Sequence, residues 1–254
     1  MTTGLPTATG FAIYPDPWLS GIIGRSALRL ATTTEAPMGD WKKRLKSDDL
    51  FVTAKLPADQ VAEANFLQDL GFHIIDTALT FETPRLSAGR SDRNVRFAHA
   101  SDREAVARLA GTAFVYSRFH LDPALPKPLA NKVKAAWASN FFAGRRGDGM
   151  VVAERDGVLA GFLQLLWAGP VLVIDLIAVS PQAARQGHAR AMIAFAAANG
   201  TGDARRPAGF RVGTQAANAP SVRLYESLGF RFKNARFVLH HHGHGGPYRT
   251  EATT

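Results

Sequence analysis

The feature that most constrains the fold is a long apolar run, Gly169 to Val179, that leads almost directly into a helix. The run contains one charged residue, Asp175, and it ends at Ser180-Pro181. It is too short to cross a bilayer, so we expect a buried strand at residues 171–179. An Ala-rich helix follows over about residues 185–198, after a short turn that contains Gly187 and Ala189. A buried strand needs further elements to cover it, so this pattern favours an α/β sheet.

Other segments repeat this alternation of strands and helices. We expect strands at residues 50–56, 72–81, 95–100, 150–154, 158–167, 210–214 and 230–241, and helices at about 57–70, 101–114, 129–143 and 219–228. Residues 84–93 are polar and contain Pro, Gly and Ser, so they form the best linker candidate. We therefore expect two domains: a smaller N-terminal α/β domain, residues 1–91, and a larger domain, residues 92–254.

Charge and composition narrow the function without fixing it. The 254 residues include 30 Lys and Arg against 21 Asp and Glu, a net charge of +9, which could attract nucleic acid, anionic lipid or a phosphorylated small molecule. The sequence has no basic helix of the kind that reads nucleic acid, so we expect no nucleic-acid partner. It has no Cys, which excludes disulfides and thiol catalysis. Residues 1–10 lack the pattern of a secretory signal, and we expect a cytoplasmic protein without membrane association.

The turn before the helix at residues 185–198 has the properties of an anion site. Small residues allow backbone amides to approach a phosphate, and a helix N-terminus supplies unpaired N–H donors. Arg185 and Arg190 add formal charge. An ordinary strand-to-helix turn is the alternative.

A second segment gives this turn a context. Phe210-Arg-Val-Gly-Thr-Gln-Ala-Ala-Asn218 is followed by Leu224-Tyr-Glu-Ser-Leu-Gly-Phe230. At this spacing the two segments resemble the GCN5-related N-acetyltransferases (GNAT), over about residues 95–240. The resemblance implies a mixed, mostly antiparallel central sheet flanked by helices, with acetyl-CoA as co-substrate. Ala184 stands where the family usually has Gln or Arg, and Arg185 could replace that contact.

The resemblance also implies roles for individual residues. It assigns acetyl-CoA binding to two strand and loop segments and to two further residues: Leu176, Ile177, Ala178 and Val179; Ala184, Arg185, Gln186, Gly187, His188, Ala189 and Arg190; and Asn218 and Tyr225. Tyr225 matches the family tyrosine that protonates the leaving thiolate, although it could also be a packed aromatic. The catalytic base is open: Asp175 could take the amine proton or contact the amine, it could form a structural hydrogen bond, or water alone could serve.

A second resemblance suggests the acceptor. The blocks Thr53 to Phe72 and Ala113 to His120 are similar to the dTDP-fucosamine acetyltransferases, which acetylate a nucleotide-linked 4-amino sugar for surface polysaccharides. Arg118, Phe119 and His120 become substrate-binding candidates, since an Arg can clamp a diphosphate and an aromatic can stack on a sugar or base. Alternatively Phe119 is core and Arg118 a surface charge. A protein, peptide or other small-molecule amine, and a non-catalytic acyl-CoA sensor, are the alternative functions.

Two further expectations concern the ends of the chain. Leu70-Gly-Phe72 in the N-terminal domain repeats Leu228-Gly-Phe230, which fits either a truncated acetyltransferase-like half or chance, since Gly often follows a helix. Such a half would carry no pyrophosphate loop and would shape the acceptor side or a homodimer interface. His240 and His242 would share a strand face, but no carboxylate is near in sequence, so we expect solvation or adventitious binding and no metal site.

Overall fold

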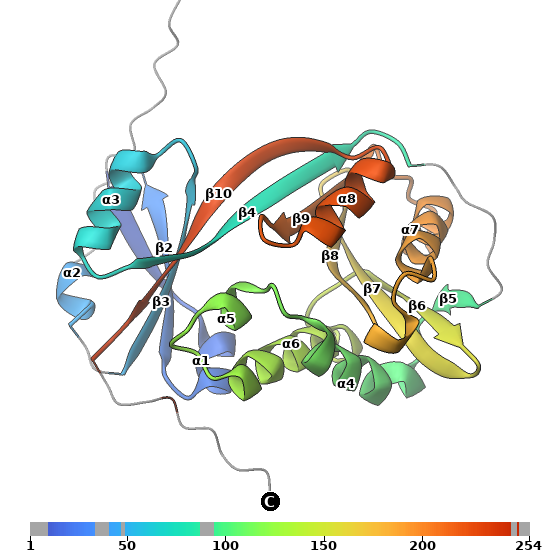
Figure 1. Ribbon diagram of the computed structural model, residues 1–254, viewed down its shortest axis with the longest axis horizontal. Helices are drawn as coiled ribbons and strands as arrows, with labels where there is room; N and C mark the ends of the chain where they lie inside the picture. The colour runs from blue at the N-terminus through green and yellow to red at the C-terminus, as the bar shows by residue number, and fades with distance from the viewer. Residues whose placement is uncertain (1–9, 34–40, 47–48, 87–93, 245–247, 249–254) are drawn as a thin grey trace, which may run out of the picture.

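A single sheet of ten strands organises the computed structural model (Figure 1), which describes residues 10–33, 41–46, 49–86, 94–244 and 248. The order across the sheet is β1-β2-β3-β10-β4-β9-β8-β7-β6-β5. Among the strands that the structure describes, only β2 with β3, and β8 with β9, pair in parallel, so the sheet is mixed and mostly antiparallel, as expected. The strands are β1 (Gly10–Pro15), β2 (Ser26–Thr33), β3 (Leu50–Pro57), β4 (His73–Thr83), β5 (Val95–Phe97), β6 (Gly149–Arg155), β7 (Val158–Ala168), β8 (Val171–Val179), β9 (Gly209–Gln215) and β10 (Arg231–His242).

Helices cover both faces of the larger half. The side chains of α4 and α6 pack on one face with Met150, Phe162 and Leu176, while those of α7 and α8 pack on the other with Val151 and Leu163. Figure 1 shows these two helix pairs on opposite sides of β7 and β8. The helices are α1 (Pro17–Ile23), α2 (Trp41–Arg44), α3 (Val61–Asp69), α4 (Arg103–Ala113), α5 (Arg118–Leu121), α6 (Lys127–Phe142), α7 (His188–Asn199) and α8 (Ala219–Ser227), with 3₁₀ turns at Ala100–Asp102 and Pro181–Ala183. In the described ranges, no helix has the length and apolarity needed to span a membrane.

Two strand–helix–strand units exchange strands at the centre of the sheet. One unit is β3-α3-β4 and the other is β9-α8-β10; β10 lies between β3 and β4, and β4 lies between β10 and β9. Both helices end alike, at Gly71 and Gly229, each with φ +87°. The N–H of Phe72 donates to Leu67 O and that of Phe230 to Tyr225 O, both at 3.0 Å. The repeated Leu-Gly-Phe therefore forms the same C-terminal cap on α3 and on α8, with its glycine in the left-handed conformation.

The N-terminal β1-α1-β2 segment was not expected from the sequence. Asp16 caps α1 by accepting from Leu19 N at 3.1 Å, and Pro17 occupies the first turn. The helix has only seven residues, and it is stabilised by burial of Leu19 and Ile23 against α6 and β3. The proposed linker lies outside the described residues from 87 to 93. The two halves of the chain share one sheet. A domain boundary at residue 91 therefore stays a proposal.

The strands β8 and β9 separate part of the way along their length. Their parallel register ends at Ile174 and Val212, whereas β9 continues to pair with β4 as far as Gln215. Residues 176–179 of β8 remain paired with β7 on their other side, and Asp175 lies at an irregularity in that register. A wedge therefore opens between the C-terminal ends of β8 and β9, with backbone groups of both strands available at its walls.

Candidate active site

A cavity of about 370 Å³ fills the wedge between β8 and β9. Its walls come from residues 174–179 of β8, residues 212–215 of β9, the start and inner face of α8, and residues 113–117 after α4. Of the residues proposed from the sequence, these reach it: Asp175, Leu176, Ile177, Ala178, Val179, Ala189, Asn218 and Tyr225. The splayed strands thus bring the two recognised segments together at one cavity.

The turn before α7 has backbone conformations that expose its amides. Arg185 and Gly187 have φ of +62° and +86°, and α7 begins at His188. The first bond within the helix that follows the turn is Ala191 N to Gly187 O at 2.9 Å, so the N–H groups of residues 188–190 have no partner in the helix. A Cβ on Gly187 would meet nothing within 4 Å, so the turn is open at this residue. This cradle fits a pyrophosphate.

The side chains around this turn are mostly exposed. Ala184 and Arg185 face solvent, and Gln186 accepts from Arg155 Nη1 at 3.0 Å. Arg190 donates to Ser227 Oγ at 2.7 Å, which connects α7 with α8. His188 is half-buried, and its Nε2 has no hydrogen-bond partner within the described part of the chain.

Tyr225 both packs in the core and lines the cavity. Its side chain is 2% exposed, and its ring contacts Phe81 and Phe230. Burial raises the pKa of Tyr225 well above its ordinary value, against a smaller opposing effect of a hydrogen bond with Ser221. The phenol is therefore protonated throughout the neutral range. Nearby, Asn218 caps α8 by accepting from Ser221 N at 3.3 Å.

Asp175 is held by three neighbouring side chains. Its oxygens accept from Arg146 Nε at 2.7 Å and Nη2 at 2.5 Å, from Trp137 Nε1 at 3.0 Å, and from Gln164 Nε2 at 3.1 Å. The hydrogen bond with Asp175 raises the pKa of Arg146, so this pair is a tight ion pair. The carboxylate lines the cavity, but its bonds favour a positioning role over removal of a proton.

A residue that the sequence analysis missed, Lys134 of α6, also lines the cavity. It is 8% exposed, and its Nζ lies 4.6 Å from the ring centre of Phe114 and 4.9 Å from that of Trp137. Burial lowers the pKa of Lys134 to about 7; repulsion from Arg118 adds to this and attraction by Asp175 opposes it. Its position in the sequence indicated burial, because Ala130 and Ala138, four residues before and after Lys134, lie on the buried face of α6.

The three substrate-binding candidates have different surroundings, and none is among the cavity residues. Phe119 is 1% exposed and packs in the core with Phe51. His120 is hydrogen-bonded through Nδ1 to Ser117 Oγ at 2.6 Å and through Nε2 to Asn131 Oδ1 at 2.9 Å, so it connects α5 with α6. Arg118 is half-buried over the Phe119 ring, and desolvation lowers its pKa to about 10. Arg118 therefore remains the candidate for an anionic ligand.

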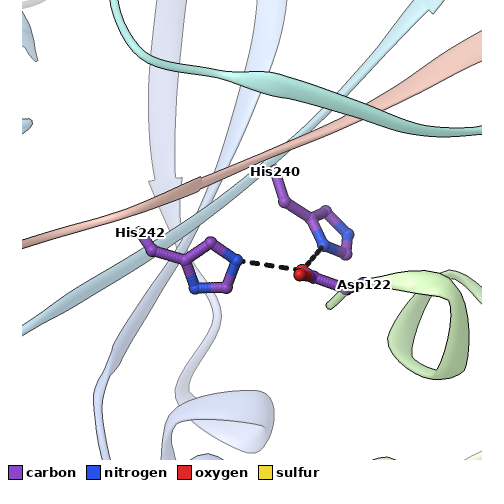
Figure 2. Close-up of side chains that lie close together, drawn as sticks. All are labelled: Asp122, His240 and His242. Carbon is purple, nitrogen blue, oxygen red and sulfur yellow. Dashed lines mark hydrogen bonds and ion pairs between the residues drawn. The ribbon is translucent and has the colours of Figure 1, made fainter. Parts of the chain in front are cut away.

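His240 is buried, His242 is half-buried, and both are hydrogen-bonded, so the expectation that these two side chains are solvated is wrong. Figure 2 shows His240 and His242 converging on Asp122, which the fold brings from the α5–α6 connection. His240 Nδ1 and His242 Nε2 lie 2.6 and 2.9 Å from the same carboxylate oxygen, and Tyr248 is hydrogen-bonded to His242 Nδ1. The shared strand face was predicted; the carboxylate, distant in sequence, was not.

These three side chains have the composition of a metal-ligand set, with their ligand atoms all within 4.8 Å of one another. Their hydrogen bonds fit a structural role instead. Burial raises the pKa of Asp122, but the bonds from the two imidazoles outweigh it and hold the pKa well below its usual range. Burial lowers the pKa of His240 to about 4, and Arg118 adds positive charge that disfavours a cation there. The cluster anchors the end of β10 to the α5–α6 connection.

The residues around this cavity are similar in sequence to a known protein family. Residues 113–230 match the model of the acetyltransferase (GNAT) family. The chain is 24% identical to the spore coat polysaccharide biosynthesis protein SpsD of Bacillus subtilis (strain 168) over 243 residues, which cover 91% of this chain and 83% of that protein. It is 26% identical to the dTDP-fucosamine acetyltransferase of Escherichia coli O6:H1 over 159 residues, or 61% and 67% of the two chains. The solved GCN5-related N-acetyltransferase of Kribbella flavida shares the fold, with a TM-score of 0.55 and 18% identity over 85% of this chain and 82% of that one.

Proposed function

The chain carries an acetyltransferase domain of the GNAT family over residues 113–230, and from this premise we propose that it transfers acetyl from acetyl-CoA to the amine of a nucleotide-linked amino sugar. The proposed acceptor is a dTDP-4-amino-4,6-dideoxyhexose used for a surface polysaccharide. The observation that carries the proposal is the cavity between the splayed ends of β8 and β9, with Tyr225 in its wall.

Acetyl-CoA fits two features of this site. The open amides at the start of α7, with Arg185 and Arg190 beside them, suit its pyrophosphate. The unpaired edge of β8, residues 175–179, offers backbone groups to the pantetheine arm and the thioester carbonyl. Acetyl-CoA supplies an activated acyl group, so the protein needs to orient the amine and stabilise the charges that develop.

Tyr225 is proposed as the general acid. A protonated phenol in the cavity wall can donate its proton to the leaving thiolate. The proton of the attacking amine leaves to Asp175 or along a path of water. Since Asp175 is already bonded to Arg146, Trp137 and Gln164, we favour the water path, with Asp175 holding the wall of the cavity.

The acceptor rests on weaker support. Two relatives carry names that refer to a polysaccharide or a dTDP-sugar, and the likeness to one of them extends over 91% of this chain. The net charge of +9 favours an anionic acceptor. A peptide amine and a non-catalytic acyl-CoA sensor remain the competing functions.

Release of coenzyme A tests the proposal. Purified protein with acetyl-CoA is offered dTDP-linked 4-amino sugars, UDP-linked amino sugars, free amino sugars and a basic peptide. We expect release with the dTDP-linked amines and a mass increase of one acetyl group on the sugar. Release with the peptide alone would replace the acceptor and keep the enzyme class. Tight acetyl-CoA binding without turnover on any amine would identify a sensor.

A further inference from the structure

One face of the sheet carries a line of charged side chains that starts at the cavity. Direct partners on neighbouring strands point to the same face. Gln215, which lines the cavity, is paired with Ala78, and Ala78 is paired with Arg236. In the next row Asp76 is paired with Val238, and Val238 with Lys55. Arg236 and Lys55 therefore lie on the face that contains the cavity wall at Gln215.

The same face lies beneath α5. Phe51 is two rows beyond Lys55 on β3, and it packs in one core cluster with Phe119 of α5. Arg118 precedes Phe119, and it is close enough to Lys55 and Lys134 to repel both of them. These four cations thus occupy neighbouring positions on β3, β10, α5 and α6. They connect the cavity with the N-terminal half of the chain.

The positive charge of these residues is poorly compensated. Within the described ranges, no ion pair forms at Lys55, Arg118, Lys134 or Arg236. Desolvation and repulsion by Arg118 and Arg236 lower the pKa of Lys55 to about 8. Three carboxylates act on these cations without forming an ion pair: Asp16 on Arg118, Asp175 on Lys134 and Asp76 on Lys55. Asp76 is 8% exposed with one oxygen unpaired among the described residues, and burial raises its pKa to about 6.

Like charges gathered beside a cavity destabilise the free protein, and a bound anion would offset that cost. Lys55 and Arg236 are exposed and Arg118 is half-buried, so all three remain accessible to a ligand. The positions come from both halves of the chain, which gives the N-terminal half a part in the acceptor site. The sugar amine would extend toward Lys134 and Tyr225, which line the cavity.

We propose that Lys55, Arg118 and Arg236 form an anion groove that binds the diphosphate of the acceptor, apart from the α7 turn assigned to coenzyme A. This proposal rests on the proposed function, because it assumes that the acceptor is nucleotide-linked. A diphosphate carries two or three negative charges and accepts hydrogen bonds from several cations at once, as this grouping offers.

Calorimetric titration of coenzyme A-saturated protein tests the groove. The probes are dTDP and inorganic pyrophosphate, and saturation with coenzyme A removes the α7 turn as a competing site. Lys55→Gln and Arg236→Gln should each weaken dTDP binding by about tenfold, the effect typical of a lost charged hydrogen bond. Arg231→Gln, an exposed arginine at the other end of β10, is the matched control and should leave dTDP binding unchanged. Coenzyme A affinity should be unaltered in all three variants, and none should unfold at a lower temperature, because Lys55→Gln and Arg236→Gln relieve repulsion in the free protein.

The outcomes separate the groove from the proposed function. If both probes bind more weakly in the two groove variants, while no nucleotide-linked amine is acetylated, the groove stands and the proposed acceptor is wrong. If wild-type protein acetylates a dTDP-linked amine and the Lys55→Gln/Arg236→Gln double variant retains its KM, the acceptor stands and the groove is overturned. Binding that Arg231→Gln weakens equally would also overturn the groove, because it would reflect net charge alone.

Discussion

Lys134 lies between two aromatic rings at the cavity, with its pKa lowered from 10.5 to about 7 by burial. The unfolded chain holds this proton up to about pH 10.5, and the folded protein releases it near pH 7. Below pH 7 the folded state therefore bears the full cost of a buried ammonium group. That cost declines as the pH rises toward 10.5, so this residue makes stability increase with pH in that window.

Lys134→Met should accordingly stabilise the free protein at pH 6, by something on the order of 4 kcal/mol, with the gain much reduced at pH 10. Urea unfolding at the two pH values measures it. Lys132→Met, two residues away and exposed, is the control and should change little at either pH. If Lys134→Met does not increase the free energy of unfolding at pH 6, then burial does not disfavour the charged form of the Lys134 amine.

Tyr225→Phe removes only the hydroxyl and keeps the ring that packs against Phe81 and Phe230. We expect kcat to fall by roughly 10²–10⁴-fold, the usual contribution of a general acid, with acetyl-CoA affinity nearly unchanged. Tyr116→Phe, which removes another phenol from the cavity wall, distinguishes a specific proton donor from a general loss of polarity. Equal kcat in wild-type and Tyr225→Phe proteins would exclude the phenol from the mechanism.

The start of α7 depends on one backbone conformation. At Gly187, with φ +86° and free space around a Cβ, an alanine meets a conformational penalty of about 1–2 kcal/mol and no clash. Gly187→Ala should therefore shift the first-turn amides and weaken acetyl-CoA binding by about tenfold or more. Gly144→Ala, with φ +65° and equally open space after α6, should cost similar stability and leave acetyl-CoA binding intact. Titration of both variants with acetyl-CoA checks this difference.

Elements with a clear period or a terminating glycine were predictable from the sequence. The strand expected at 171–179 and the helix expected at 219–228 agree with β8 and α8 to within one residue. Helix α1 was missed because seven residues carry little periodic signal, and its stability comes from Asp16 and from burial of Leu19.

Long-range contacts explain most of the remaining differences at the site. Asp175, Asn218 and Tyr225 reach the cavity because their motifs fix local geometry. Asp122 beside His240 could not be foreseen, since 118 residues separate them in the chain. Phe119 looked accessible in the sequence because its burial depends on Phe51, which lies in the other half.

The whole molecule depends on the exchange of β4 and β10. Without residues 1–91, β10 loses both of its neighbours, β3 and β4, and β9 loses one. A fragment of residues 92–254 should therefore show no cooperative unfolding transition by circular dichroism, because unpaired strands leave polar backbone groups and apolar surface exposed. Coexpression with residues 1–91 should restore the transition. A fragment that melts cooperatively and binds acetyl-CoA unaided would establish residues 92–254 as an independent domain.

The exchanged strands also determine when the central sheet can be completed during synthesis. A ribosome that has just completed β4 must still add about 150 residues before β10 begins. At ordinary elongation rates that interval is roughly 7–30 s, during which the place of β10 between β3 and β4 stays empty. An open pair of strand edges is a target for unwanted pairing with other nascent chains. Slowing translation between residues 83 and 231 should thus lower the yield of folded protein, whereas slowing it after residue 242 should not.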